Sequence, residues 1–343
     1  MGHWIPFNDP TEFGLMGSIS LTIASIEQKE HDFLPNLRTD SHVVVVSDYA
    51  GDQKGAKFNV YSFLLADRPG ILGIWDRERR TLRQRFLKDG RRIEFKKLGD
   101  QTKQKALGPF LEAASSINGV LFCVAIDKAI KSVTSPKRLP TKSEISEFSQ
   151  HPWSPRVFEK LVRVLSFGSF LVAGLCRKDQ SLHWITDEDD IVANEEIQRD
   201  VCRIADRFLH HYVSQPLAEM ALGIAGKFDD ERRAEDLVSI VDLVGGTVSA
   251  YLSAFDQKDF PATSKVIVPV LKHMSTKSQI VFAWLCQSRR PLKKMICVLR
   301  PSEDGKMRFD FLNIQNLTGL TGGKLPLWVP PDKGWVKSIK SWK

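Results

Sequence analysis

The sequence predicts an α/β protein in which helices flank a mixed central sheet. Two apolar segments, 43–46 and 119–126, lack polar alternation, as strands buried on both faces do. The first is four consecutive valines, whose β-branched side chains favour strands. Residues 157–175 and 195–213 instead repeat apolar positions with a helical period. An opening run of strands followed by alternating strands and helices is expected of helices packed on one sheet.

The other elements follow in order along the chain. Strands are expected at 42–48, 58–66, 92–98, 119–126 and 182–186, and helices at 102–115, 157–175, 195–213 and 231–252. After a further helix, strands at 295–299 and 307–312 form a basic hairpin around a turn at 302–306. Residues 16–26 fit a helix or a strand, and the proline-rich segment 132–155 is expected to be an exposed excursion. We therefore expect an extension packed on the core (1–40), a catalytic domain (41–255) and a basic C-terminal extension (256–343).

Composition favours a folded protein with polyanionic partners. The 343 residues are 42% hydrophobic and carry a formal net charge of +8, which suits nucleic acid as a partner. The five cysteines are an odd number without C-x-x-C spacing, which indicates reduced thiols in a cytoplasmic protein and no zinc site. Neither a signal peptide nor an apolar run of about 18 residues is recognised, so no membrane partner is expected.

Positive and negative residues are segregated along the chain. Residues 76–105 carry 12 Lys/Arg against 5 Asp/Glu, and residues 265–308 carry 10 against 2. Residues 187–206 carry 8 acidic residues against 2 arginines. A site that combines metal ions with phosphates needs such separation, although solvated helix faces produce the same pattern. The basic side chains taken as nucleic-acid contacts are Lys96, Lys97, Arg289, Arg290, Lys293 and Lys294.

Acidic residues stand where predicted strands end. Asp48, Asp127 and Asp187 each follow an apolar strand, and Asp242 interrupts the apolar helix 231–252 beside small residues. Capping or turn hydrogen bonds are the ordinary roles of such residues. A buried acid is nevertheless costly unless it is paired, and four strand-end or helix acids in one chain favour a shared role.

A divalent-metal site explains the four acids together. Two Mg²⁺ ions about 3.5–4 Å apart can activate water and stabilise the leaving oxygen during phosphodiester hydrolysis. Magnesium prefers oxygen ligands and keeps several waters, so three or four carboxylates suffice. Asp48, Asp187 and Asp242 are the predicted catalytic ligands for Mg²⁺ or Mn²⁺. Asp127 is a predicted fourth ligand, and Glu188 is the alternative ligand next to Asp187. Other hydrolase chemistry lacks support, because neither H-E-x-x-H nor G-x-S-x-G occurs.

Five short motifs follow one another between residues 42 and 252. They are Asp48-Tyr49-Ala50-Gly51-Asp52, Glu94-Phe95-Lys96, Val124-Ala125-Ile126-Asp127, Thr186-Asp187-Glu188 and Val241-Asp242-Leu243-Val244-Gly245. Their order resembles the ribonuclease-H-like fold and looks most like the bacterial domain-of-unknown-function 3800 family. In that family the first motif is Asp-Glu-Ser-Gly, so Tyr49 and Ala50 replace its Glu and Ser here.

The resemblance implies a metal-dependent nuclease acting on RNA or DNA, by analogy of fold. A role in bacterial defence would suit such a family. If the family Glu is a metal ligand, Tyr49 weakens the site, and the alternative is a catalytically inactive nucleic-acid-binding or scaffold subunit on the same fold. A third reading is an interaction protein that docks an acidic protein partner. A homo-oligomer fits any of the three.

Overall fold

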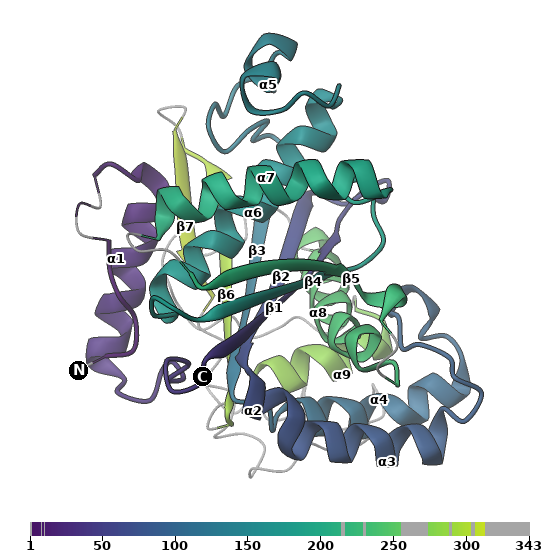
Figure 1. Cartoon of the computed structure of the whole chain (residues 1–343). Coiled ribbons are helices and arrows are strands. Elements are labelled where there is room, and N and C mark those ends of the chain that lie inside the picture. The colour runs from purple at the N-terminus through teal and green to yellow at the C-terminus, as the bar shows by residue number, and fades with distance from the viewer. Residues whose placement is uncertain are drawn as a thin grey trace, which may run out of the picture.

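The centre of the protein is a single mixed sheet with helices on both faces (Figure 1). The computed structural model describes residues 2–7, 9, 11–213, 217–228, 231–254, 274–287, 290–302 and 306–312. Within these residues the sheet has seven strands in the order β5-β4-β1-β2-β3-β6-β7. The α/β class and the mixed sheet predicted from the sequence are thereby confirmed.

The sheet has an antiparallel centre, parallel pairs on both sides of it and one antiparallel edge strand, β7. The strands are β1 (His42–Ala50), β2 (Phe58–Asp67), β3 (Gly119–Asp127), β4 (Ser181–Thr186), β5 (Glu219–Ile224), β6 (Leu292–Pro301) and β7 (Met307–Phe311). Strands β1, β2 and β3 pair antiparallel, while β4 joins β1, β5 joins β4 and β6 joins β3 in parallel. Strand β7 returns antiparallel to β6, as the hairpin pattern predicted.

Helices cover both faces of this sheet. They are α1 (Gly14–Lys29), α2 (Arg68–Gly70), α3 (Asp76–Phe86), α4 (Gln101–Ala114), α5 (Lys142–Phe148), α6 (Pro155–Leu175), α7 (Glu195–Tyr212), α8 (Arg233–Ala254) and α9 (Thr276–Leu285). A π-helical turn (Ile71–Trp75) and two 3₁₀ turns (Phe95–Lys97 and Ala225–Lys227) complete the described elements. The undecided segment 16–26 is helical, and α5 lies in the predicted excursion (Figure 1).

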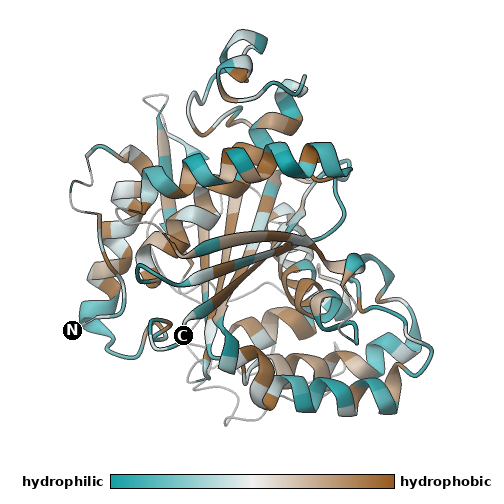
Figure 2. Cartoon of the chain, viewed as in Figure 1, coloured by the Kyte–Doolittle hydropathy of each residue, from teal (hydrophilic) through white to brown (hydrophobic). Residues whose placement is uncertain are grey.

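Each face of the sheet has its own apolar core. On one side α1, α6 and α7 pack against Val43 and Val45 of β1, and on the other α3, α4, α8 and α9 pack in the core that contains Val46. Figure 2 shows apolar residues concentrated in the central strands and in the helices that face them. The valine run is therefore buried on both faces, as its lack of alternation predicted.

Helix α8 packs closely at two glycines, Gly245 against the sheet and Gly246 against the 3₁₀ turn that contains Phe95. A Cβ at Gly245 would stand 3.1 Å from Ser62 Oγ, and one at Gly246 would stand 2.3 Å from the Phe95 ring. Helix α8 is also long and apolar enough to span a membrane by length and composition, but 78% of its most apolar window is buried in this fold. It is a core helix of this fold, positioned by its glycine flank.

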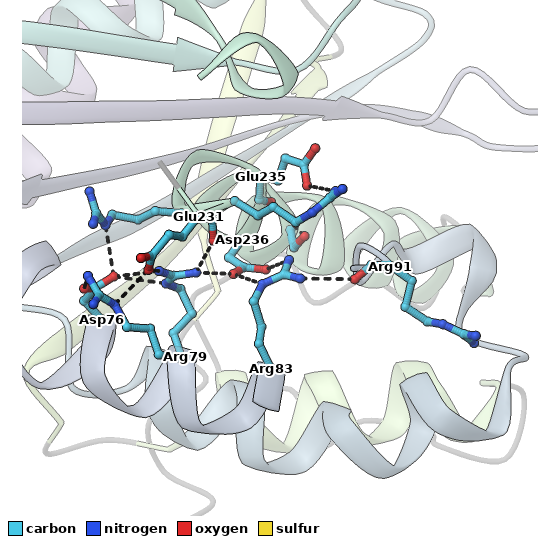
Figure 3. A network of polar contacts seen from close by, with 11 residues as sticks. Asp76, Arg79, Arg83, Arg91, Glu231, Glu235 and Asp236 are labelled. Atoms are coloured by element: carbon cyan, nitrogen blue, oxygen red, sulfur yellow. Dashed lines mark hydrogen bonds and ion pairs between the residues drawn. The ribbon is translucent and has the colours of Figure 1, made fainter. Parts of the chain in front are cut away.

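Buried ion pairs join α3 to α8 (Figure 3). Arg79, whose side chain is 0% exposed, contacts Asp76 at 2.9 Å and Asp236 at 3.1 Å. Arg83 donates two hydrogen bonds to Asp236, of 2.7 and 2.6 Å. The basic stretch 76–105 is therefore only partly available to phosphates, because two of its arginines neutralise buried acids inside the protein.

One local prediction is wrong, and one strand was missed. Residues 92–98 do not form a strand: they contain a 3₁₀ turn, and the Phe95 N–H donates to the Asp242 carboxylate at 2.6 Å in place of a strand partner. Strand β5 was not predicted. Strands β6 and β7 extend the same sheet as β1–β5, so this part of the basic C-terminal extension is continuous with the core. Residues 255–273 and 313–343 lie outside the described residues.

Candidate functional site

Three of the predicted acids come together on the face of the sheet that α8 covers. Ser47 pairs with Thr186 in the parallel β1–β4 register. Asp48 and Asp187 are the next residues along these two adjacent strands, so they lie side by side. Strand alternation directs Asp48 to the same face as Val46. Asp242 approaches from α8, and its charge acts on the pKa of Asp48. We call Asp48, Asp187 and Asp242 the acid cluster.

The segment just before and within the 3₁₀ turn contacts two members of the acid cluster. The Arg92 guanidinium donates two hydrogen bonds of 2.8 Å, one to each carboxylate oxygen of Asp187. The Phe95 backbone N–H donates to Asp242 Oδ2 at 2.6 Å. Lys277 Nζ donates to the Phe95 carbonyl at 2.6 Å and lies 4.3 Å from the centre of its ring. These contacts hold residues 92–95 beside the acids.

Negative charge exceeds positive charge in the acid cluster. The pKa of Asp48 is raised well above the ordinary carboxyl value of 3.8, first by burial and then by the charges of Asp242 and Asp187. Burial also raises the pKa of Asp242, against the lowering effects of the Phe95 hydrogen bond and the Arg92 charge. A carboxylate in such a position either takes up a proton or is stabilised by a further cation.

The acid cluster matches a hard divalent cation in its donor atoms. All three side chains supply carboxylate oxygens, which Mg²⁺ and Mn²⁺ prefer. Within the residues that the structure describes, however, no three His, Cys, Asp or Glu side chains converge closely enough to hold one metal ion. Both Asp187 oxygens instead face Arg92. The donor types therefore fit a metal, while in this arrangement Arg92 supplies the nearest positive charge.

Asp127 and Glu188 lie apart from the acid cluster. In the β1–β2–β3 register Asp127 is opposite Phe58, whereas Asp48 is opposite Ser62, four residues further along β2. The Asp127 carboxylate accepts the Ala129 N–H at 2.8 Å, the ordinary turn contact. Glu188 is exposed, and only its backbone N–H reaches Asp187 Oδ1, at 3.0 Å. Neither carboxylate is brought together with the three acids.

The predicted basic contacts fall into two groups. Lys96 and Lys97 are exposed beside the acid cluster, and Lys97 pairs with Glu94 at 2.9 Å. Arg290 pairs with Glu112 at 2.8 Å and Lys293 is half-buried at the start of β6. Arg289 lies outside the described residues.

Lys294 was wrongly predicted to contact phosphates. Only 7% of the residue is exposed, and its Nζ donates to the backbone carbonyls of Trp284 and Gln287 at 3.0 and 3.3 Å. The ammonium also lies 4.4 Å from the centre of the Trp284 ring. Burial lowers the pKa of Lys294 to about 7. Lys294 lies in a largely apolar strand, and its side chain points into the core. A count of basic residues in the sequence cannot distinguish such a buried lysine from surface lysines.

Tyr49 lies on the opposite face of the sheet from the acid cluster. Its hydroxyl is hydrogen-bonded to Ser47 Oγ at 2.9 Å and to Thr186 Oγ1 at 3.2 Å. Burial raises the pKa of this hydroxyl far above its ordinary value. The Tyr49 side chain therefore points away from the α8 face of β1, and it does not contact the carboxylates of the acid cluster.

Sequence reasoning missed two residues at the site. Arg92 was expected in a strand, and Lys277 was counted only within the basic segment 265–308. The separation of an arginine from a later aspartate by 95 residues leaves no local pattern in the sequence. The one available signal was the glycine pair Gly245-Gly246 on α8. Gly246 leaves room for a large neighbouring side chain, and the structure places the Phe95 ring there, three residues after Arg92.

Comparison with protein-family models, curated proteins and solved structures found no match to this chain. The resemblance of its motif order to a nuclease family consequently has no independent support from related proteins. The chemistry of the acid cluster is the remaining ground for proposing a function.

The raised pKa of Asp48 predicts an inverse dependence of stability on pH in metal-free buffer. The folded state keeps a proton that the unfolded state, with a pKa near 3.8, has already released. This stabilisation is complete below about pH 4 and is lost as pH rises through the folded-state pKa, at about 1.4 kcal/mol per unit of pKa difference. Urea unfolding with chelator present should therefore show Asp48→Asn becoming more stable than wild type toward pH 8. Parallel pH profiles for the two proteins would contradict this.

Proposed function

We propose that this protein is a divalent-metal-dependent nuclease with a ribonuclease-H-like fold. The observation that supports this most is the meeting of Asp48, Asp187 and Asp242 on one face of the sheet. They come from β1, from the end of β4 and from α8, in the chain order that the resemblance implies. Carboxylates gathered in this way are the ligands that two-metal phosphodiester hydrolysis requires.

Each residue then has a definite role. Asp48, Asp187 and Asp242 would hold Mg²⁺ or Mn²⁺, and the cation when bound would activate water and stabilise the leaving oxygen. The exposed ammonium groups of Lys96 and Lys97 lie on the segment that borders the acids, where they are suited to contact the phosphate backbone. Binding through such contacts weakens as salt is raised, because condensed counterions are released from the nucleic acid.

The test is cleavage of labelled RNA, single-stranded DNA and duplex DNA in parallel. With Mn²⁺ or Mg²⁺ present, we expect at least one of these substrates to be cut, and with excess chelator none. The three substrates also distinguish ribonuclease from deoxyribonuclease activity. Failure to cut any of them with either metal would reject the enzymatic proposal.

A second candidate is a nucleic-acid-binding or scaffold subunit that retains the fold without the chemistry. The observation that favours it is the occupation of the acids by protein groups: Arg92 contacts both oxygens of Asp187, and Phe95 contacts Asp242. In the same assay this candidate predicts binding without cleavage, with affinity that falls steeply as salt rises. If the protein neither binds nor cleaves any of these nucleic acids, the next candidate is a role in binding an acidic protein partner.

A further inference from the structure

Arg92 stands at the solvent-facing side of the acid cluster. Its side chain is 17% exposed and that of Asp187 is 31% exposed, so water and small cations reach this ion pair without unfolding of the core. Among the described residues, the buried Nε of Arg92 has no hydrogen-bond partner. The guanidinium is thus held by its two bonds to Asp187 and by the charge of the acid cluster.

The backbone near Arg92 is fixed independently of that ion pair. Three residues later, Phe95 is anchored by its N–H bond to Asp242, by the Lys277 hydrogen bond to its carbonyl and by the packing of its ring on Gly246. Release of the Arg92 side chain from Asp187 therefore does not require the segment to leave α8. An arginine side chain has enough rotatable bonds to swing into solvent from a fixed backbone.

We propose that Arg92 is a built-in counter-ion that competes with the divalent cation for Asp187, so that metal binding requires Arg92 to release this carboxylate. This inference rests on the proposed function, because it assigns Asp187 to the metal. It makes Arg92 a positioning residue that sets how tightly the site binds its cation. The competition also reconciles the matching donor atoms with the lack of three converging ligands among the described residues.

Competition follows from the geometry of the pair. Arg92 donates to both oxygens of Asp187, and Oδ1 additionally accepts the Glu188 N–H. A divalent cation on Asp187 would face the guanidinium at short range, where like charges repel strongly because the surroundings are partly desolvated. Simultaneous occupation is therefore unfavourable, and removal of the arginine charge should favour the metal.

The experiment is a titration with Mn²⁺ alone, followed by electron paramagnetic resonance of the free ion. We expect Arg92→Gln to bind Mn²⁺ about tenfold more tightly than wild type, because the repulsion between the guanidinium and the cation is removed. Arg91→Gln is the matched control: it removes the same charge from the adjacent residue, which is paired with Asp89 and Asp100 at the surface. That variant should bind Mn²⁺ with wild-type affinity.

The outcomes separate this inference from the proposed function. If wild type binds Mn²⁺ and Arg92→Gln binds it no more tightly, the competition is refuted while the metal site stands. If wild type and the Arg92 variants all fail to bind Mn²⁺, both proposals are refuted. Should Arg92→Gln not fold, as judged by circular dichroism, Arg92→Ala decides, because it also removes both the charge and the two-bond contact and should likewise bind Mn²⁺ more tightly than wild type.

Discussion

Replacement of Asp236 by alanine is expected to lower the free energy of unfolding by about 3–5 kcal/mol, the usual cost of leaving buried charges without their partner. The Asp236 side chain is 1% exposed and contacts Arg79 and Arg83. Arg79 is fully buried, and among the described residues it would keep its contacts with Asp76 and with the Glu231 backbone and side chain. Urea or thermal unfolding measures the change, and α3 should be the element that detaches most readily from α8.

Asp89→Ala provides the matched control for this loss. Asp89 also pairs with an arginine, but its side chain is 50% exposed, and such exposed pairs contribute little to stability because water screens them. Both variants remove a carboxylate that pairs with arginine, but one carboxylate is buried and the other is exposed to solvent. Equal destabilisation by Asp236→Ala and Asp89→Ala would show that the α3–α8 ion pairs do not hold these helices together.

Asp48→Asn is expected to reduce metal-dependent cleavage by at least about a thousandfold, which corresponds to a loss of about 4 kcal/mol in transition-state stabilisation. Asparagine preserves the size of the side chain but removes the negative charge that a divalent cation requires. The fold should survive, because the amide also removes charge repulsion from Asp187 and Asp242. Initial rates with saturating Mn²⁺ measure the effect.

Asp127→Asn is the control for that variant. Asp48 lies near the C-terminal end of β1 and Asp127 at the C-terminal end of β3, yet Asp127 accepts a turn hydrogen bond and lies outside the acid cluster. We expect its cleavage rate to stay within about threefold of wild type, a difference of less than 1 kcal/mol. A loss at Asp127 as large as that at Asp48 would contradict the separation of the two sites.

Hydrophobic patterning predicted the core of the fold because burial acts on local sequence. The run 43–46 is apolar at every position since β1 is covered by helices on both faces. Helices α6 and α7 begin and end within two residues of the bounds predicted from their apolar periods. Strand β5 escaped prediction because it lies at the edge of the sheet, where every residue but Ile224 is exposed or half-buried, so burial imposes no strong apolar pattern on Glu219–Ile224.

The candidate site was predicted only in part, because charge pairing depends on tertiary contacts. Asp48, Asp187 and Asp242 could be singled out, since each interrupts or ends an apolar segment. The positive groups that contact these acids could not be predicted, because Arg92 and Asp187 are 95 residues apart in the sequence. Lys294 was misassigned for a related reason: its carbonyl partners come from the end of α9, which no count of nearby charges reveals.

The error at residues 92–98 has a similar origin. Ile93 is fully buried and Phe95 half-buried, so the alternation that suggested a strand is real. Its cause is packing of a turn on α8, where Gly246 leaves room for the Phe95 ring. Two-residue alternation reports which side chains face inward, but it does not determine whether backbone groups bond to a strand or to the side chains of Asp242 and Lys277.

The shared metal site of Asp48, Asp187 and Asp242 is tested most directly by locating bound Mn²⁺. Crystals grown with Mn²⁺ should give an anomalous difference peak among these three carboxylates at the manganese absorption edge, with Arg92 withdrawn from Asp187. Mn²⁺ bound elsewhere, or no peak beside an intact Arg92–Asp187 pair at saturating Mn²⁺, would contradict the assignment of these acids as metal ligands.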